Sequence, residues 1–217
     1  MVVEPMSNSQ KLNSLVTQLV SASDPEKVKQ LYAQWADSYE SDLDSFGYVA
    51  PLIGVNLLSQ RVSDKSALLH DAGCGTGLVG KLLRELGYAR LHGSDFSTDM
   101  LNKARVANHY IELQTMDFAE RLPIASNTYG AAISIGVYTK RFNEHFLAEM
   151  VRIIRPSAWF VFSCRELYFD EVMQCVSDML RGKAVVKADI QYDDYMVGQN
   201  ASAYYFSLQK NKRSAEQ

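Results

Sequence analysis

Apolar and polar side chains follow a helical period in the first part of the chain. Apolar residues recur every three or four positions over about 9–20, and again from Pro25 to a break at Gly47, which predicts two amphipathic helices. Ser23 and Asp24 precede the second of these helices, and either suits its N-cap. A third helix is expected over about 49–62.

From Ser66 onward, short apolar runs alternate with segments of helix length. Strands are expected over about 66–71, 89–94, 109–115, 129–137 and 158–163, and helices over about 78–86, 98–107, 143–154 and 167–181. Pro156 is expected to stop the helix before the fifth strand. Two further strand-like runs, 184–192 and 202–209, have no helix between them and should pair antiparallel at one edge. The pattern predicts an α/β fold with a doubly wound, mostly parallel, seven-stranded sheet.

The chain therefore divides into an N-terminal helical cap over residues 1–62 and a doubly wound core over residues 63–217, which together make one structural domain. Helices that precede the first strand cannot belong to a β-α-β crossover. They are expected to act as a lid over the carboxyl edge of the sheet, where open α/β sheets bind ligands.

Composition and charge exclude several classes of protein. The net charge is −3, and the basic run of Lys210, Lys212 and Arg213 is expected to be a solvated tail, so no nucleic-acid partner is indicated. Three cysteines without close pairs and four histidines without ligand spacing predict neither disulfides nor a metal site. No signal peptide and no membrane span are predicted, so a cytoplasmic location is expected.

The most informative stretch follows the first predicted strand, which ends at Asp71. Gly73, Gly75 and Gly77 form a turn that lets a ligand approach the backbone, and a helix N-terminus points its N–H groups into the same space. Gly75 to Gly80 also fits the dinucleotide pattern GxGxxG, with an acid about 20 residues further on. That turn, however, would open four residues beyond the strand, and the Asp71 carboxylate would repel a pyrophosphate.

A ligand with an ammonium group would instead be attracted by Asp71, and S-adenosylmethionine has such an amino-acid end. The glycine motif from Asp71 to Gly77 resembles motif I of the class I S-adenosylmethionine-dependent methyltransferases. Residues 93–101 resemble the family's second motif, and 115–118 are similar to its adenine-contacting segment. The segment 146–162 looks like the helix and fifth strand of the family, whose fold is Rossmann-like.

The N-terminal segment 32–40 resembles the YxxWAxxYD entry of small-molecule methyltransferases, of which the Williams-Beuren-region methyltransferase-like group is the nearest type. In such proteins the helix tyrosines close over the methionine end of the cofactor. The alternative is that Tyr32, Trp35 and Tyr39 are a packed helix face.

The resemblance implies a site for S-adenosylmethionine, with S-adenosylhomocysteine as the product. The cofactor-binding residues that it implies are Tyr32, Tyr39, Asp71, Gly73, Cys74, Gly75, Asp95, Phe96, Met100, Asp117, Phe118 and Ile135. Tyr39, Tyr138 and His145 are the candidates for catalytic roles, although His145 also suits an exposed helix surface. Transfer of an activated methyl group needs mainly positioning, so no metal and no obligatory base are expected.

The acceptor is expected to be a small molecule, because motifs for DNA and protein-arginine acceptors are missing and the N-terminus is similar to a lid. The last two predicted strands add aromatic residues, Tyr195 among them, which suit either an acceptor pocket or the core of the sheet, and Gly136 after the fourth strand is expected near the reacting group. The sequence departs from the family where Gly130 replaces an acid and where Lys140 and Arg141 replace a Gly-His pair. Ser157 and Ala158 replace two glycines, which should alter the turn before the fifth strand. Two alternatives remain open: an NAD(P)-dependent oxidoreductase, and a non-catalytic module that binds S-adenosylmethionine and partners another protein.

Overall fold

The computed structural model describes residues 15, 17–19, 24–139 and 143–212. Its helices are α2 (Pro25–Trp35), α3 (Tyr39–Ser45), α4 (Ala50–Ser59), α5 (Leu78–Glu85), α6 (Thr98–Ala107), α7 (Asn143–Ile153) and α8 (Phe169–Arg181). Its strands are β1 (Leu69–Ala72), β2 (Leu91–Asp95), β3 (Glu112–Thr115), β4 (Tyr129–Ser134), β5 (Ile154–Arg165), β6 (Val185–Met196) and β7 (Ala201–Lys210).

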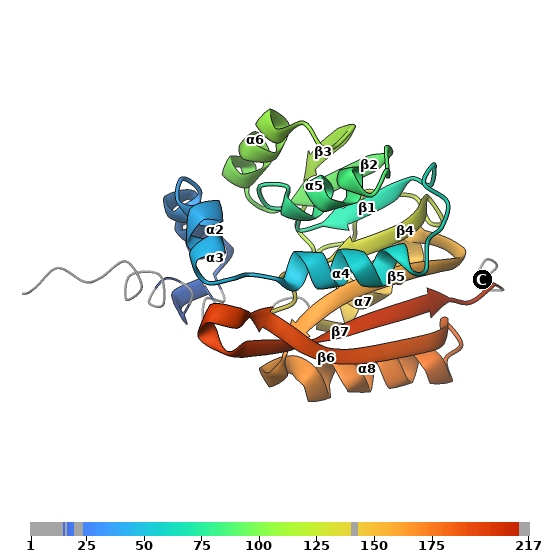
Figure 1. Cartoon of the computed structure of the whole chain (residues 1–217). Coiled ribbons are helices and arrows are strands. Elements are labelled where there is room, and N and C mark those ends of the chain that lie inside the picture. Colours follow the sequence, from blue (N-terminus) through green and yellow to red (C-terminus); the bar gives the residue numbers. More distant parts are fainter. Residues whose placement is uncertain (1–14, 16, 20–23, 140–142, 213–217) are drawn as a thin grey trace, which may run out of the picture.

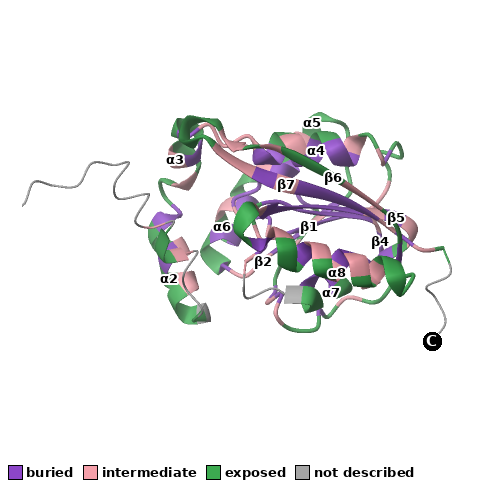
Figure 2. Ribbon diagram, turned by 90° about the horizontal axis from the view of Figure 1, so that it is seen from below, coloured by how far each residue is buried: buried purple, intermediate pink, exposed green. Residues whose placement is uncertain are grey.

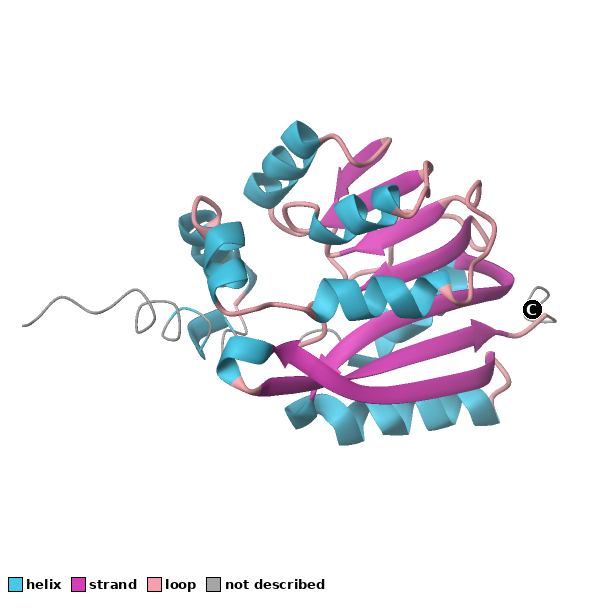
Figure 3. Ribbon diagram, viewed as in Figure 1, coloured by secondary structure: helices cyan, strands magenta, loops and turns pink. Residues whose placement is uncertain are grey.

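The strands form one seven-stranded sheet in the order β3-β2-β1-β4-β5-β7-β6 (Figure 1). The first five strands are parallel, and β7 pairs antiparallel with both β5 and β6. Helices lie on both faces of the sheet (Figure 3). The predicted doubly wound sheet with an antiparallel pair at its edge is therefore confirmed.

Both faces of the central strands are buried, as the purple ribbon of Figure 2 shows. In β4, Ala131 and Ile133 pack with the core under α4, α5 and α6. Ala132 points to the opposite core, which includes side chains of α7 and α8. This alternation follows from the two-residue period of a strand, and it explains why β4 is apolar at nearly every position.

The helix that the sequence predicts up to Gly47 is in fact two helices. Helix α2 ends at Trp35, and α3 begins at Tyr39 after a short turn. The indole N–H of Trp35 donates to Asp42 Oδ2 at 3.0 Å, which fixes α3 against the end of α2. A hydrogen bond between side chains seven positions apart cannot be predicted from helical periodicity.

Strand β5 begins earlier than predicted, at Ile154, directly after α7. Pro156 thus lies within the strand, where it cannot donate a ladder hydrogen bond. The pairing with β4 shifts register opposite this segment, between Tyr129 and Ala131, and Ser157 has a φ of 67°. The irregularity accommodates within the strand a proline that is expected from sequence to stop the preceding helix.

Helix α4, predicted as part of the cap, packs on the face of the sheet. Ala50 and Leu58 are fully buried there, and a Cβ on Gly54 would lie 2.4 Å from Ile135 Cδ1. By contrast, α2 and α3 stand at the carboxyl edge of the sheet (Figure 1). The division of the chain at residue 62 remains a prediction.

Lys210 was expected in a solvated tail and is instead 4% exposed at the end of β7. Its amine donates to Asn127 Oδ1 at 2.8 Å and to the carbonyls of Arg152 and Ile154 at 3.0 and 2.9 Å. These bonds attach the last strand to the junction of α7 and β5. Arg213, most of the predicted helix over 9–20, and the pair at 140–141 lie outside the described residues.

Among the described residues, no helix combines the length and apolar character that a bilayer crossing requires.

Candidate functional site

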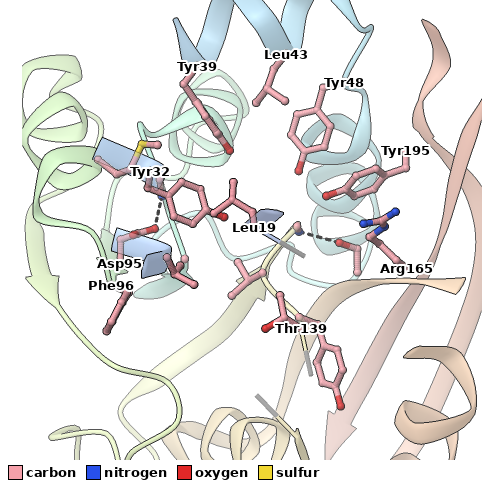
Figure 4. A pocket seen from close by; sticks show the side chains of 18 of the residues that line it. Leu19, Tyr32, Tyr39, Leu43, Tyr48, Asp95, Phe96, Thr139, Arg165 and Tyr195 are labelled. Carbon is pink, nitrogen blue, oxygen red and sulfur yellow. Dashed lines mark hydrogen bonds between the residues drawn. The ribbon is translucent and has the colours of Figure 1, made fainter. Parts of the chain in front are cut away.

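A cavity lies between the carboxyl edge of the sheet and the helices α2 and α3 (Figure 4). Its walls come from the cap, from the glycine turn after β1 and from the ends of β2, β4, β5 and β6. Predicted site residues that line it are Tyr32, Tyr39, Gly73, Gly75, Asp95, Phe96, Met100, Phe118 and Tyr138. Most of the site predicted from sequence is therefore brought together in space.

The glycine turn shapes the floor of the cavity. Gly73 and Gly75 have φ values of 76° and 54°, in the left-handed region that side chains with a Cβ avoid. A Cβ on Gly73 would lie 2.1 Å from Val137 Cγ2, whereas nothing lies within 4 Å of a Cβ on Gly75. Gly75 thus faces open space at the position where a ligand would approach the backbone.

Asp95 stands at the end of β2 with both carboxylate oxygens engaged. Its Oδ2 accepts the N–H of Gly75 at 2.9 Å, and its Oδ1 accepts the N–H of Ser97 at 2.8 Å. Burial raises the pKa of this carboxyl, and the backbone N–H groups oppose the rise. Each oxygen keeps a further acceptor site, so the carboxylate can accept two hydroxyls of a vicinal diol.

Asp71, at the end of β1, lies outside the lining of the cavity. It is 2% exposed beneath the turn, where the hydroxyl of Tyr110 donates to its Oδ2 at 2.6 Å and accepts the N–H of Gly80 at 3.0 Å. Burial raises the pKa of Asp71 to about 7. Asp71 does not line the cavity, so an ammonium group of a ligand above the turn would reach it through water.

Two buried polar atoms near the turn lack a partner among the described residues: Asp71 Oδ1 and Thr76 Oγ1. Such atoms cost free energy unless a donor or a water molecule reaches them. Together with the open space at Gly75, they fit a polar ligand end above the turn, reached through water at Asp71.

Other predicted residues lie near the cavity without lining it. Cys74 is buried with its Sγ against the backbone of Gly93, and Ile135 packs against α4. Asp117 Oδ1 accepts the N–H of Ala119 at 3.0 Å. His145 is exposed on α7 and does not reach the cavity, which agrees with the alternative given for it from sequence.

The aromatic residues of the cap serve two purposes at once. Trp35 is 7% exposed and its ring contacts Tyr39, with centroids 4.7 Å apart and nearly perpendicular planes. Tyr32 and Tyr39 line the cavity, and burial together with the Asp95 carboxylate raises the pKa of both phenols. Lys29 Nζ lies 4.6 Å from the centroid of Phe96, joining the cap to the end of β2. Tyr32, Trp35 and Tyr39 therefore pack against one another and also line the cavity, so the two alternatives given for them from sequence do not exclude each other.

Sequence reasoning missed two residues, Tyr48 and Arg165, that line the end of the cavity opposite Asp95. Tyr48 and Tyr195 meet there with ring centroids 5.1 Å apart, and their hydroxyls share a hydrogen bond. A Cβ on Gly136 would lie 2.5 Å from the Tyr48 hydroxyl and 3.0 Å from that of Tyr195. Arg165, at the end of β5, completes this wall. Gly136 lies where the sequence predicts residues close to the reacting group, directly after the fourth strand, and it admits the close approach of both hydroxyls.

Comparisons with known proteins agree with this geometry. Residues 70–157 match the family model described as a methyltransferase domain. Methyltransferase-like protein 27 of Homo sapiens is 37% identical over 108 residues, which are 48% of this chain and 44% of that protein. A malonyl-(acyl-carrier protein) O-methyltransferase of Buchnera aphidicola subsp. Baizongia pistaciae (strain Bp) is 30% identical over 143 residues, 64% of this chain and 55% of that protein. The chain spans about half the length of these curated relatives.

Solved structures share the fold at low sequence identity. A TehB-like SAM-dependent methyltransferase from Corynebacterium glutamicum superposes with a TM-score of 0.60 and 13% identity, over 83% of this chain and 98% of that one. The cyclase SpnF gives a TM-score of 0.64 and 13% identity, over 88% and 98%. Proteins with different names thus share this fold, and sequence identities this low are evidence for a common fold only. Residues 70–157 are thus similar to a methyltransferase domain, and the chain has the Rossmann-like fold that the matched methyltransferase structures share.

Proposed function

We propose that the protein transfers the methyl group of S-adenosylmethionine to a small-molecule acceptor. The observation that carries this proposal is a single cavity that runs along the strand ends from Asp95, past Gly75, to Gly136. Such a cavity can hold a long ligand by its ribose at one end and leave room for a second molecule at the other.

Each part of the cofactor has matching groups along this path. Asp95 would accept the ribose hydroxyls, and the apolar side chains of Phe96, Met100 and Phe118 would border the adenine. The backbone at Gly75 would allow close approach of the middle of the cofactor, and Tyr39 would close over its methionine end.

The bound cofactor would supply an activated methyl group on a sulfonium centre. The protein then has to hold the acceptor in line with that group and keep water away. Tyr138 serves in positioning, because its hydroxyl donates to Glu171 Oε1 at 3.2 Å and its pKa is raised by burial. A phenol in that state is a donor at neutral pH and not a base.

The oxidoreductase alternative fits the turn less well. The last glycine of the dinucleotide pattern, Gly80, lies inside α5, and a Cβ there would lie 2.4 Å from the hydroxyl of Tyr110. This glycine is therefore explained by packing against Tyr110, without a dinucleotide. Asp71 adds a buried carboxyl group below the turn, close to where a pyrophosphate would lie.

A small acceptor is favoured by the way the cap limits access to the cavity. The relative from Buchnera aphidicola is named for O-methylation of a malonyl group carried on a protein, which supports a compact reacting group at this site. The methylated atom of this chain's own acceptor is oxygen, nitrogen or sulfur, each of which this site can present to a sulfonium methyl group.

The proposal is tested by calorimetric titration with S-adenosylhomocysteine and, in parallel, with NADH. We expect the first ligand to bind in the micromolar range and the second not to bind. Asp95→Asn should weaken S-adenosylhomocysteine binding by about 1–3 kcal/mol, since charge-assisted hydrogen bonds to the ribose are lost. Asp99→Asn, an exposed acid on α6, is the matched control and should leave the affinity unchanged.

Undiminished affinity in Asp95→Asn would contradict the site assignment. Binding of NADH alone would favour the oxidoreductase. Tight binding of S-adenosylhomocysteine with no methyl transfer to any acceptor in a broad screen would favour the non-catalytic module.

A further inference from the structure

The charges along the cavity are few and far apart. Of the described residues that line it, only Asp95 and Arg165 carry a formal charge. Asp95 ends β2 and Arg165 ends β5, with β1 and β4 between them. Three strand spacings separate the two positions, or about 14 Å at the usual distance between neighbouring strands. Arg165 therefore lies past β4, away from the ribose end of the site.

Arg165 has no carboxylate partner among the described residues. The adjacent acid, Glu166, accepts a hydrogen bond from the hydroxyl of Tyr192. Figure 4 shows Arg165 beside Tyr195 at one end of the cavity, and the positive charge of Arg165 favours the ionised form of that phenol. Burial nevertheless keeps the pKa of Tyr195 above its ordinary value, so its hydroxyl stays a donor.

The groups around Arg165 are mainly hydrogen-bond donors. Ser163 Oγ accepts the N–H of Gly136 at 2.9 Å, which leaves its hydroxyl proton to donate elsewhere. The Tyr48 and Tyr195 hydroxyls lie above the same glycine. Arg165 thus presents a planar guanidinium group, with hydroxyl donors beside it, in a wall that is otherwise aromatic. Such a set of donors can bind a planar carboxylate.

We propose that this end of the cavity binds a carboxylate of the methyl acceptor and that Arg165 selects it. The inference rests on the proposed function, which places the cofactor between Asp95 and Gly136. The acceptor is then a small carboxylic acid, and an uncharged analogue leaves the guanidinium without its partner in a partly buried site.

The test uses the full chain, with and without saturating S-adenosylhomocysteine. A panel of short straight-chain mono- and dicarboxylates and their matched amides is titrated calorimetrically. We expect at least one carboxylate to bind and its amide to bind about 10- to 100-fold more weakly. Arg165→Gln should remove this preference while S-adenosylhomocysteine affinity stays unchanged, and Arg165→Lys should restore part of it.

Arg155→Gln is the matched control, since Arg155 is exposed at the opposite end of the same strand. Equal affinity for acid and amide, no carboxylate binding at all, or an Arg165→Gln variant that keeps the preference would overturn the inference. If the unaltered protein does not bind S-adenosylhomocysteine, the proposed function is contradicted instead. The carboxylate titrations carried out without that ligand then still test whether Arg165 selects a carboxylate.

Discussion

Asp71 is a carboxyl group that the fold buries beside a single hydrogen-bond donor. Burial raises its pKa to about 7, and the bond from Tyr110 only partly offsets this. The unfolded chain ionises this group at about pH 3.9. Between these two values the folded protein holds a proton that the unfolded chain has released. The contribution of Asp71 to stability is therefore complete at low pH and is lost as the pH rises toward 7.

Replacing Asp71 with Asn should remove this pH dependence. We expect the free energy of unfolding of the unaltered protein, relative to Asp71→Asn, to fall by about 1 kcal/mol per pH unit between roughly pH 4 and 7. His70 has a pKa lowered to about 3 by burial and contributes the opposite slope, so only the difference between the two proteins isolates Asp71. Urea denaturation at several pH values measures it, and parallel pH profiles for the two proteins would refute the assignment.

At the scale of elements, the start of β5 carries backbone strain at Ser157, one of the two residues that stand in place of glycines in the turn before the fifth strand. Ser157 has a φ of 67°, a conformation that costs a residue with a Cβ about 1–2 kcal/mol. The bulge it belongs to lets Pro156 enter a central strand.

Ser157→Gly should relieve part of this strain. We expect the free energy of unfolding to increase by about 0.5–1 kcal/mol, because the relief exceeds the extra freedom of glycine in the unfolded chain. Ser157→Ala, which keeps the Cβ, is the control and should not stabilise the protein. If both variants shift the urea midpoint equally, the strain is not located at this residue.

The assignment of segments as helices or strands could be predicted from the spacing of apolar residues, because those residues form the buried face of each helix and strand. The glycine turn and Asp95 could be predicted as well, since both belong to one β-α-β unit formed by β1, α5 and β2. The break between α2 and α3, and the early start of β5, depend on a Trp35–Asp42 bond and on a register shift against β4. Such pairings between separate segments leave no trace in periodicity.

At the scale of the molecule, the cavity depends on a contact between two segments far apart in sequence. The connection before α4 pairs with the end of β6, where Val49 N–H donates to the Tyr195 carbonyl at 3.1 Å and Gly198 N–H to that of Phe46 at 2.9 Å. This contact sets Tyr48 against Tyr195 and closes the wall opposite Asp95. Tyr48 and Arg165 were missed from sequence because only the assembled sheet brings them to the same wall of the cavity.

The central claim is that S-adenosylmethionine lies between the cap and the carboxyl edge of the sheet. A crystal structure of the full chain with S-adenosylhomocysteine tests it most directly. We predict the ribose on Asp95, the adenine beside Phe96 and Met100, and the homocysteine sulfur directed toward Gly136, with Arg165 left free beyond it. A ligand bound elsewhere, or with its ribose turned away from Asp95, would contradict the account.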